Sequence, residues 1–282
     1  MKILYLCAGF GLLAAPLAAQ DHPVTLKAMR LLDGRGGVVQ NPLITIEQGR
    51  IVRIETARRG ARVTYDLSGM TVMPGLIDVH DHIAWHFNVQ GRLHSDGDGE
   101  TPAQATFAIA ANAYATLLAG FTTTQELGSP EDLDLRAAIA AGRIPGPRIV
   151  TSLDPISDPR QSPEQLRQLV RDRKAAGADL IKIFASRSIR EGGAQTLSDS
   201  QLVALCGEAK LLGLRTVVHA HSAESMRAVA LAGCTQIEHG VFATAEVLRL
   251  LAERGTWYDP QCSLVFRNYL DNRPKFEGIG NY

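Results

Sequence analysis

Neither sign of charge is in excess in this sequence of 282 residues. Lysine and arginine total 29, as do aspartate and glutamate, so the formal net charge at pH 7 is zero. A general nucleic-acid binder carries a basic excess, and nucleic-acid binding is therefore not expected. The sequence has no acidic or basic tail, and its 26 glycines and 13 prolines are spread along the chain, which argues against disorder.

Cysteine is scarce, with four residues in all. Cys7 lies in the N-terminal segment, and the remaining three, Cys206, Cys234 and Cys262, have no close spacing. This pattern excludes both a disulfide framework and a zinc knuckle. We interpret the three cysteines as buried small hydrophobic residues. The sequence leaves open whether two of them form a disulfide.

A long apolar run occurs only at the N-terminus. Lys2 precedes the uncharged stretch 3–17, and the small residues Ala18 and Ala19 follow it. This pattern predicts a secretory signal over residues 1–20, and hence a secreted or periplasmic protein with no membrane contact after cleavage. The run is short for a membrane-spanning helix, although an uncleaved N-terminal anchor is the alternative.

Two patterns follow the signal. Residues 21–72 contain short strand patterns separated by turn residues and predict a small all-β unit. Residues 73–282 alternate apolar strands with helical stretches, several of which end at a glycine, as parallel βα units do. Capping patterns at Ser162 and Ser198 predict two of the helix starts. The predicted strands of the second region lie at 76–80, 121–126, 148–152, 180–184, 216–220, 235–239 and 256–259.

Seven strands fall one short of a closed (β/α) barrel, which needs eight. An open barrel would leave two unpaired strand edges, which natural sheets avoid. We therefore expect either closure by another chain or a longer protein of which this sequence is the front part.

Histidines gather at the ends of three predicted strands. His80 and His82 follow the first strand, His219 and His221 follow the fifth, and His239 follows the sixth. Residues two apart in a strand face the same side, so each pair projects together. The carboxyl ends of barrel strands form the active-site face, and neutral imidazole is a good ligand for zinc and related metals. The pattern indicates a metal site rather than scattered histidines.

Lys182 lies in an otherwise apolar strand, where alternation predicts that it faces the barrel interior with Leu180 and Phe184. Burial would lower its pKa and leave a reactive amine. A strand-end lysine that reaches solvent is the alternative.

Six motifs in order resemble the amidohydrolase superfamily, in its imidazolonepropionase-like and Xaa-Pro dipeptidase-like branch. They begin at residues 74–82 and 119–123 and continue through 146–149, 181–183, 218–221 and 237–240. The resemblance implies an α/β fold, a (β/α)8 TIM-type metallo-hydrolase barrel with a partial small β-sandwich at residues 21–72.

The resemblance also implies a metal centre with one or two divalent ions, zinc being the expected metal. The implied ligands are His80, His82, His219, His239 and Lys182, the last as a CO2-derived carbamate. His221 is assigned to substrate contact or to support of the ligands.

Two departures from the family pattern concern catalysis and specificity. The family's aspartate at the end of strand eight has no counterpart, so no catalytic residue is identified in this chain, and Asp259 belongs to strand seven. The loop at 151–159 also lacks the histidine with which relatives in this branch bind substrate.

The leading hypothesis is a metal-dependent hydrolase that cleaves an amide, peptide or other C–N bond of a small-molecule or dipeptide-like substrate. A truncated, non-catalytic fragment or metal-binding module is one alternative. A lactone or phosphoester hydrolase with the same metal centre is another, because fold does not fix substrate. Whether the protein forms a homo-oligomer stays open. The stretch 85–94 after the first barrel strand is either a pocket wall or a surface loop.

Overall fold

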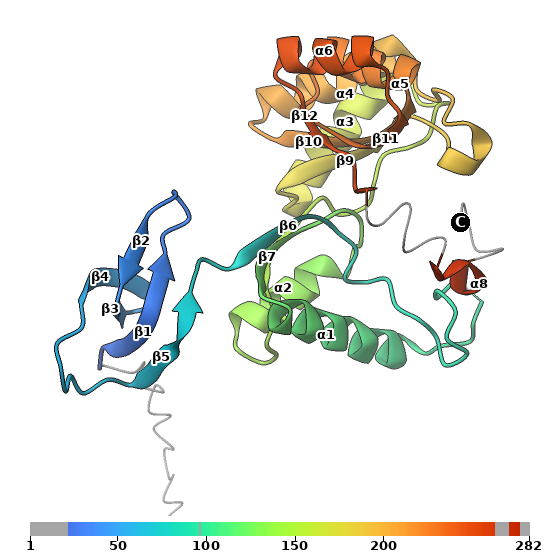
Figure 1. Cartoon of the computed structure of the whole chain (residues 1–282). Coiled ribbons are helices and arrows are strands. Elements are labelled where there is room, and N and C mark those ends of the chain that lie inside the picture. The colour runs from blue at the N-terminus through green and yellow to red at the C-terminus, as the bar shows by residue number, and fades with distance from the viewer. Residues whose placement is uncertain (1–21, 96, 263–270, 277–282) are drawn as a thin grey trace, which may run out of the picture. The chain divides into compact units, whose positions relative to one another are not determined.

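The computed structural model describes residues 22–95, 97–262 and 271–276 (Figure 1). The predicted signal at residues 1–20 lies outside them. The chain forms two units, Met1–Pro74 and Gly75–Tyr282. Within the described ranges, no helix combines the length and hydrophobicity needed to span a membrane.

The first unit is a β-sheet. Strands β1, β3 and β4 pair antiparallel, β2 extends the sheet beside β1, and β5 pairs parallel with β1. Gln48 and Gly49 connect β3 to β4 with φ angles of 48° and 72°, the left-handed geometry that a tight hairpin turn needs. Ala28, Leu31 and Ile44 form the buried part of this unit. The strands are β1 (Val24–Leu32), β2 (Val38–Gln40), β3 (Pro42–Glu47), β4 (Arg50–Thr56) and β5 (Tyr65–Val72).

The second unit alternates parallel strands with helices, as the sequence predicts. All seven predicted strands are present within one or two residues of the expected bounds, apart from a longer β10 and β11. The strands are β6 (Leu76–Asp81), β7 (Phe121–Glu126), β8 (Arg148–Thr151), β9 (Leu180–Phe184), β10 (Arg215–Ser222), β11 (Gln236–Phe242) and β12 (Trp257–Asp259). The helices are α1 (Pro102–Leu118), α2 (Asp132–Ala140), α3 (Pro163–Ala176), α4 (Asp199–Leu211), α5 (Ala223–Leu231), α6 (Ala245–Arg254) and α8 (Arg273–Phe276), with a 3-10 turn at Ile189–Glu191.

The seven strands form two parallel sheets. The three-stranded sheet has the order β6-β7-β8, and the four-stranded sheet has the order β9-β10-β11-β12. Ile156 links them, because its N–H donates to Lys182 O and its carbonyl accepts from Phe184 N, both at 2.9 Å. Among the described strands, β6 pairs only with β7 and β12 only with β11.

Local sequence signals explain where the helices begin and end. Capping boxes at Thr101, Ser162 and Ser198 start α1, α3 and α4, which confirms the two predicted caps. Gly177 and Gly255 end α3 and α6 in the left-handed conformation, as predicted from their position before a strand.

Alternation along the strands separates an outer from an inner face of the four-stranded sheet. Ile181, Ile183 and Val218 belong to the large apolar cluster that includes residues of α3 to α6. Leu180 and Val217 belong to a separate small cluster with Leu127. The face with Leu180 and Val217 is therefore the one that carries Lys182 and His219.

The structure confirms the expected burial of Cys206 and Cys234 and contradicts that of Cys262. Cys206 of α4 and Cys234, which lies just before β11, form a disulfide with a Cα separation of 5.0 Å. Cys262 is free and exposed, so its expected burial is wrong. It follows β12 and lies outside the apolar cluster, whereas the two bonded cysteines are part of that cluster.

Candidate metal centre

Strand β6 places His80 and His82 close together. Their Nε2 atoms are 3.3 Å apart, and their ring centroids are 5.2 Å apart. The side chain of Asp78 accepts from the N–H of His80, and Asp81 accepts from the N–H of His82. Asp81 also accepts from the Thr124 hydroxyl of β7 at 2.7 Å. These bonds fix the backbone from which both imidazoles project.

Strand β10 contributes His219 and His221 from its inner face. Their ring centroids are 4.5 Å apart, and the ring of Phe184 lies 4.9 Å from that of His219. The N–H of His221 donates to the Ser186 hydroxyl at 3.1 Å. The two imidazoles therefore extend over the end of the neighbouring strand β9.

Strand β11 brings in His239 through an unusual backbone conformation. Alternation places Glu238 on the inner face and would turn His239 outward. However, His239 has a φ of 69° and Gly240 a φ of 53°, so the alternation is interrupted there. A Cβ at Gly240 would lie 2.6 Å from the Tyr258 ring, so glycine is required. As a result, the His239 ring lies 4.8 Å from His219 and 5.1 Å from His80.

Lys182 is 1% exposed in the middle of β9. Its Nζ lies 5.2 Å from the centroid of the Phe184 ring. Burial lowers the pKa of Lys182 to about 8, although the charges of Glu238 and Glu126 act in the opposite direction. The lysine is thus an interior residue, and the alternative of a solvent-reaching side chain is wrong.

Burial also keeps the five imidazoles neutral. It holds the pKa values of His80 and His82 well below 6.5 and lowers those of His219 and His221 to about 3 and about 4. The pKa of His239 is lowered in the same direction, with burial as the main cause and His219 next. Neutral imidazoles offer lone pairs, which is the form that binds a metal.

Sequence reasoning missed Glu238, although it quoted the motif that contains it. Glu238 is fully buried, and its Oε2 lies 2.6 Å from His80 Nδ1. Gln236 Nε2 donates to Oε1 at 2.6 Å. Burial raises the pKa of Glu238 to about 7, and the charge on Lys182 opposes that rise. With Nδ1 donating to Glu238, the Nε2 lone pair of His80 faces His82.

Asp259 belongs to the same group as His80 and Glu238, since one ligand atom from each lies within 4.8 Å of the others. In the sequence, Asp259 is predicted to belong to strand seven and not to replace the aspartate of strand eight. Its position at the end of β12 nevertheless brings its carboxylate beside Glu238, and this proximity contributes to a raised pKa of Asp259, after burial as the main cause.

A second buried carboxylate, Glu126, was also missed. It ends β7, is fully buried, and one of its oxygens has no hydrogen-bond partner in the described part of the chain. Burial first, and Asp132 next, raise its pKa to about 9. Asp132 in turn accepts a hydrogen bond from the Thr151 hydroxyl at 2.5 Å. These groups support the three-stranded sheet beside the histidines.

The donor set fits a divalent transition metal. The Nε2 atoms of His80 and His82 lie 3.3 Å apart. Glu238 accepts a hydrogen bond from the other ring nitrogen of His80, as carboxylates commonly do for metal-binding histidines. The buried Nδ1 atoms of His82 and His221 have no hydrogen-bond partner among the described residues. Imidazole and carboxylate ligands together suit zinc and its neighbours.

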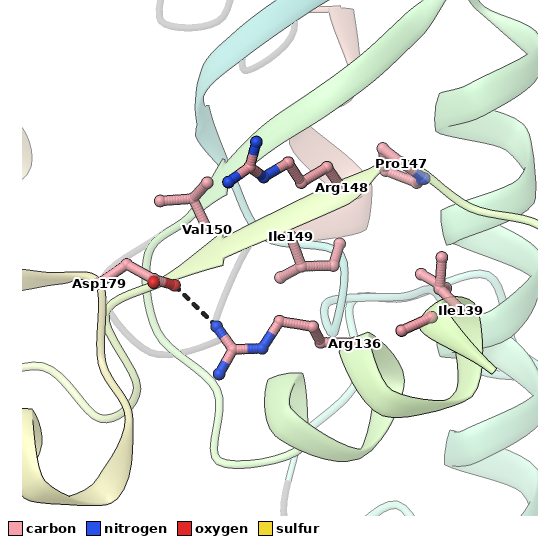
Figure 2. Close-up of a pocket in the computed structure, with 8 residues that line it drawn as sticks. Arg136, Ile139, Pro147, Arg148, Ile149, Val150 and Asp179 are labelled. Carbon is pink, nitrogen blue, oxygen red and sulfur yellow. Dashed lines mark hydrogen bonds and ion pairs between the residues drawn. The ribbon is translucent and has the colours of Figure 1, made fainter. Parts of the chain in front are cut away.

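A cavity in the described part of the chain lies away from these histidines. It has a volume of about 450 Å3 and lies beside α2 and β8, where Arg136 pairs with Asp179 at 2.8 Å (Figure 2). A smaller cavity of about 290 Å3 borders Val79, Tyr258 and Asp259. Neither of these two cavities is lined by a residue of the predicted ligand set.

Residues 71–274 match the amidohydrolase family, and this match covers more than half of the chain. The chain belongs to the amidohydrolase family. This finding confirms the resemblance that the sequence motifs indicate.

The relatives include hydrolases of amide and peptide bonds. Ochratoxinase of Aspergillus niger is 24% identical over 287 residues, which cover 83% of this chain and 58% of ochratoxinase. The structure is similar to that of a Xaa-Pro dipeptidase with methionine in its active site, with a TM-score of 0.78 and 27% identity over 93% of this chain and 71% of that one. The structure is also similar to that of a prolidase in complex with N-methylphosphonate-L-proline. The TM-score is 0.77 and the sequence identity is 25%, over 91% of this chain and 70% of the prolidase chain.

The same comparisons confirm the fold class. The neighbours are TIM-barrel metallo-hydrolases, and the parallel sheets of the second unit agree with that architecture. The chain spans just over half the length of the curated relative, so the activity of the whole protein is treated below as a proposal.

Proposed function

We propose that the chain carries the metal centre of a hydrolase that cleaves an amide, peptide or other C–N bond. The observation that carries the proposal is the convergence of five neutral imidazoles from three strand ends, with ring centroids 4.5 to 5.2 Å apart between neighbours. Membership in a family that binds divalent metals supports it.

In this proposal His80, His82, His219, His239 and Lys182 hold one or two zinc ions. A bound divalent metal polarises a carbonyl group and makes a water molecule acidic enough to act as a nucleophile near neutral pH. Glu238 holds His80 in the tautomer that presents Nε2. His221, whose buried Nδ1 has no hydrogen-bond partner among the residues that the structure describes, contacts the substrate or supports its neighbours.

Lys182 takes part as a carbamate. Its neutral amine attacks carbon dioxide, an N–C bond forms, and a proton leaves the nitrogen. The product is a carboxylate that can act as a ligand, whereas the protonated amine has no lone pair. The pKa of about 8 supports this step, because a larger fraction of the amine is neutral at physiological pH than for an exposed lysine.

The proposed substrates are small molecules or dipeptide-like compounds. The support comes from the Xaa-Pro dipeptidase, the prolidase and ochratoxinase described above. Relatives in this branch bind substrate with a histidine in the loop that corresponds to 151–159, and this chain has none there. The proposal therefore does not include a preference for proline.

We further propose a secreted or periplasmic location. The signal pattern at residues 1–20 is its main support. The Cys206–Cys234 disulfide agrees with an oxidising compartment.

The test is hydrolysis by the 282-residue chain loaded with zinc and supplied with bicarbonate. Dipeptides, N-acyl amino acids, lactones and phosphotriesters are offered separately. We expect amide cleavage that is lost on chelation and lost in Lys182→Ala. Lys174→Ala, which removes an exposed lysine of α3, serves as the matched control and keeps the wild-type rate.

Other outcomes would separate the alternatives. Cleavage of lactones or phosphotriesters without amide cleavage would favour the hydrolase of another bond. Zinc binding without any hydrolysis would favour the metal-binding module and contradict the proposed activity for this chain.

A further inference from the structure

The segment after β6 carries a second cluster of metal-binding side chains. His86, His94 and Glu100 each offer one ligand atom, and these three atoms lie within 4.8 Å of one another. His86 Nε2 is 2.7 Å from Glu100 Oε2, and His94 Nδ1 is 3.0 Å from the same oxygen. None of these residues belongs to the ligand set assigned above.

Backbone hydrogen bonds hold His86 and His94 next to each other. Phe87 and Leu93 form an antiparallel bridge, and the N–H of His94 donates to the carbonyl of His86 at 2.8 Å. This small hairpin places the two rings in a stack with centroids 4.6 Å apart. Glu100 immediately precedes Thr101, the capped start of α1, so its backbone is anchored by the helix.

The two contacts of His86 call for a positive charge between its ring and Glu100. His86 Nδ1 lies 3.0 Å from the carbonyl oxygen of Ala84, and only a protonated Nδ1 can donate to it. In neutral His86 the Nε2 lone pair then faces the Glu100 carboxylate at 2.7 Å, which is repulsive. Either a second proton on the ring or a metal cation between the two groups removes this repulsion, and the contacts of His94 distinguish the two. A backbone carbonyl behind the ring is also the usual support of a metal-binding histidine.

His94 supplies a second, independent indication. Its Nδ1 atom is buried and has no hydrogen-bond partner among the described residues, although Glu100 Oε2 is only 3.0 Å away. The contact lacks the alignment of a hydrogen bond. A buried nitrogen close to a carboxylate oxygen but not bonded to it is the arrangement expected of two ligands that share one ion.

The cluster is sheltered from solvent. The side chains of His86 and Glu100 are 6% and 11% exposed, and that of His94 is 29% exposed. Tetrahedral ligands at about 2.1 Å from a zinc ion lie about 3.4 Å apart. Small rotations of the side chains would open the present 2.7 and 3.0 Å separations to that value.

We infer that His86, His94 and Glu100 form a second site for a divalent transition metal of the zinc class, separate from the barrel centre. Two imidazoles and one carboxylate leave the fourth position to water or another ligand. The neighbour of His86, Trp85, stacks on His82 with centroids 4.1 Å apart. A metal here would therefore fix the segment that packs against the barrel centre.

The experiment separates the two centres by removing one of them. His80→Ala/His82→Ala in the 282-residue chain disables the barrel centre, and equilibrium dialysis against zinc chloride measures bound zinc. We expect about one zinc per chain in this background. Adding His94→Ala or Glu100→Ala weakens that binding at least tenfold, whereas adding His22→Ala, an exposed histidine of the first unit, leaves it unchanged.

The inference is overturned if zinc binding in the background is the same with and without His94→Ala and Glu100→Ala. In that case His86 and Glu100 only stabilise the loop through their hydrogen bond. Should the background variant fail to fold, the wild-type chain gives the same answer, because His94→Ala then lowers total zinc by one per chain with no loss of helical circular dichroism. An unchanged total would contradict the inference, which does not depend on the proposed hydrolase activity.

Discussion

The two sheets of the second unit differ sharply in how much apolar surface they bury. The four-stranded sheet shares one cluster of 22 buried residues with its helices, whereas the three-stranded sheet shares a cluster of five with α1 and α2. Leu76 and Ile77 of β6 are 42% and 64% exposed. The proposed ligands are thus divided between a well-packed and a sparsely packed sheet.

The contact between His80 and Glu238 connects the two sheets. It joins β6 of the three-stranded sheet to β11 of the four-stranded sheet at 2.6 Å. A metal held by ligands from both sheets would add to this contact and to the link through Ile156. The site therefore contributes to the position of the sparsely packed sheet, together with backbone links such as that through Ile156. The following predictions test how the two sheets differ.

The largest expected effect is the loss of a large side chain from the main cluster. Leu205→Ala removes a fully buried side chain of α4 and should lower the free energy of unfolding by about 3 kcal/mol. Ile77→Ala, on the exposed face of β6, should cost about 0.5 kcal/mol. Urea unfolding measures both, and equal losses would contradict the comparison.

Removal of the disulfide should have an effect of similar size. Cys206→Ala/Cys234→Ala releases a link across 28 residues and should destabilise the four-stranded half by about 3 kcal/mol. The exposed Cys262 provides the control, since Cys262→Ala should leave the unfolding midpoint unchanged. A midpoint insensitive to the double substitution would show that the link contributes nothing.

Loss of the bridging glutamate should weaken metal binding. Glu238→Ala removes the group that orients His80 and should reduce zinc affinity about 10- to 100-fold, as loss of such partners generally does. Glu253→Ala, an exposed residue of α6, should leave the affinity unchanged. Calorimetric titration with zinc compares them, and equal affinities would argue against a role for Glu238.

The buried Glu126 should give the three-stranded sheet a pH dependence. Its pKa is raised to about 9 from an ordinary 4.5, so the folded state keeps a proton that the unfolded chain releases. The stability that this group contributes is therefore lost as the pH rises from about 4.5 to about 9. The glutamine in Glu126→Gln does not titrate, so the variant does not lose this stability as the pH rises. The melting temperature of the variant minus that of the wild type should therefore increase from pH 4.5 to pH 9. A constant difference would contradict the raised pKa.

The smallest effects concern the helix caps. Thr101→Ala at α1 and Ser198→Ala at α4 each remove the side chain of a capping box and should cost about 1 kcal/mol. The two losses should be similar, because a cap acts locally and does not depend on the size of the cluster below it. Thermal unfolding of the two variants checks this, and a much larger loss at one cap would show that it also supports the packing.

Local signals in the sequence were sufficient to predict the order of the elements. Glycines before strands, capping patterns and apolar runs are short-range features, and they located the seven strands of the second unit. Strand β2 has only three residues, which are too few to show a strand pattern in the sequence.

The histidines and Lys182 of the candidate site could be predicted because each lies in or at the end of a strand that the local pattern shows. The role of Glu238 could not be predicted, because its partner His80 is 158 residues away. The conformation of His239, with its positive φ, breaks the alternation on which strand reasoning depends. The Cys206–Cys234 link likewise depends on how α4 packs beside the start of β11.

The most direct test of the central claim is a crystal structure of the zinc-loaded chain with anomalous data at the zinc absorption edge. The proposal predicts an anomalous peak about 2.1 Å from the Nε2 atoms of His80 and His82. Density for a carbamate on Lys182 is expected beside it. A fully loaded crystal with no peak at these two histidines would contradict the account.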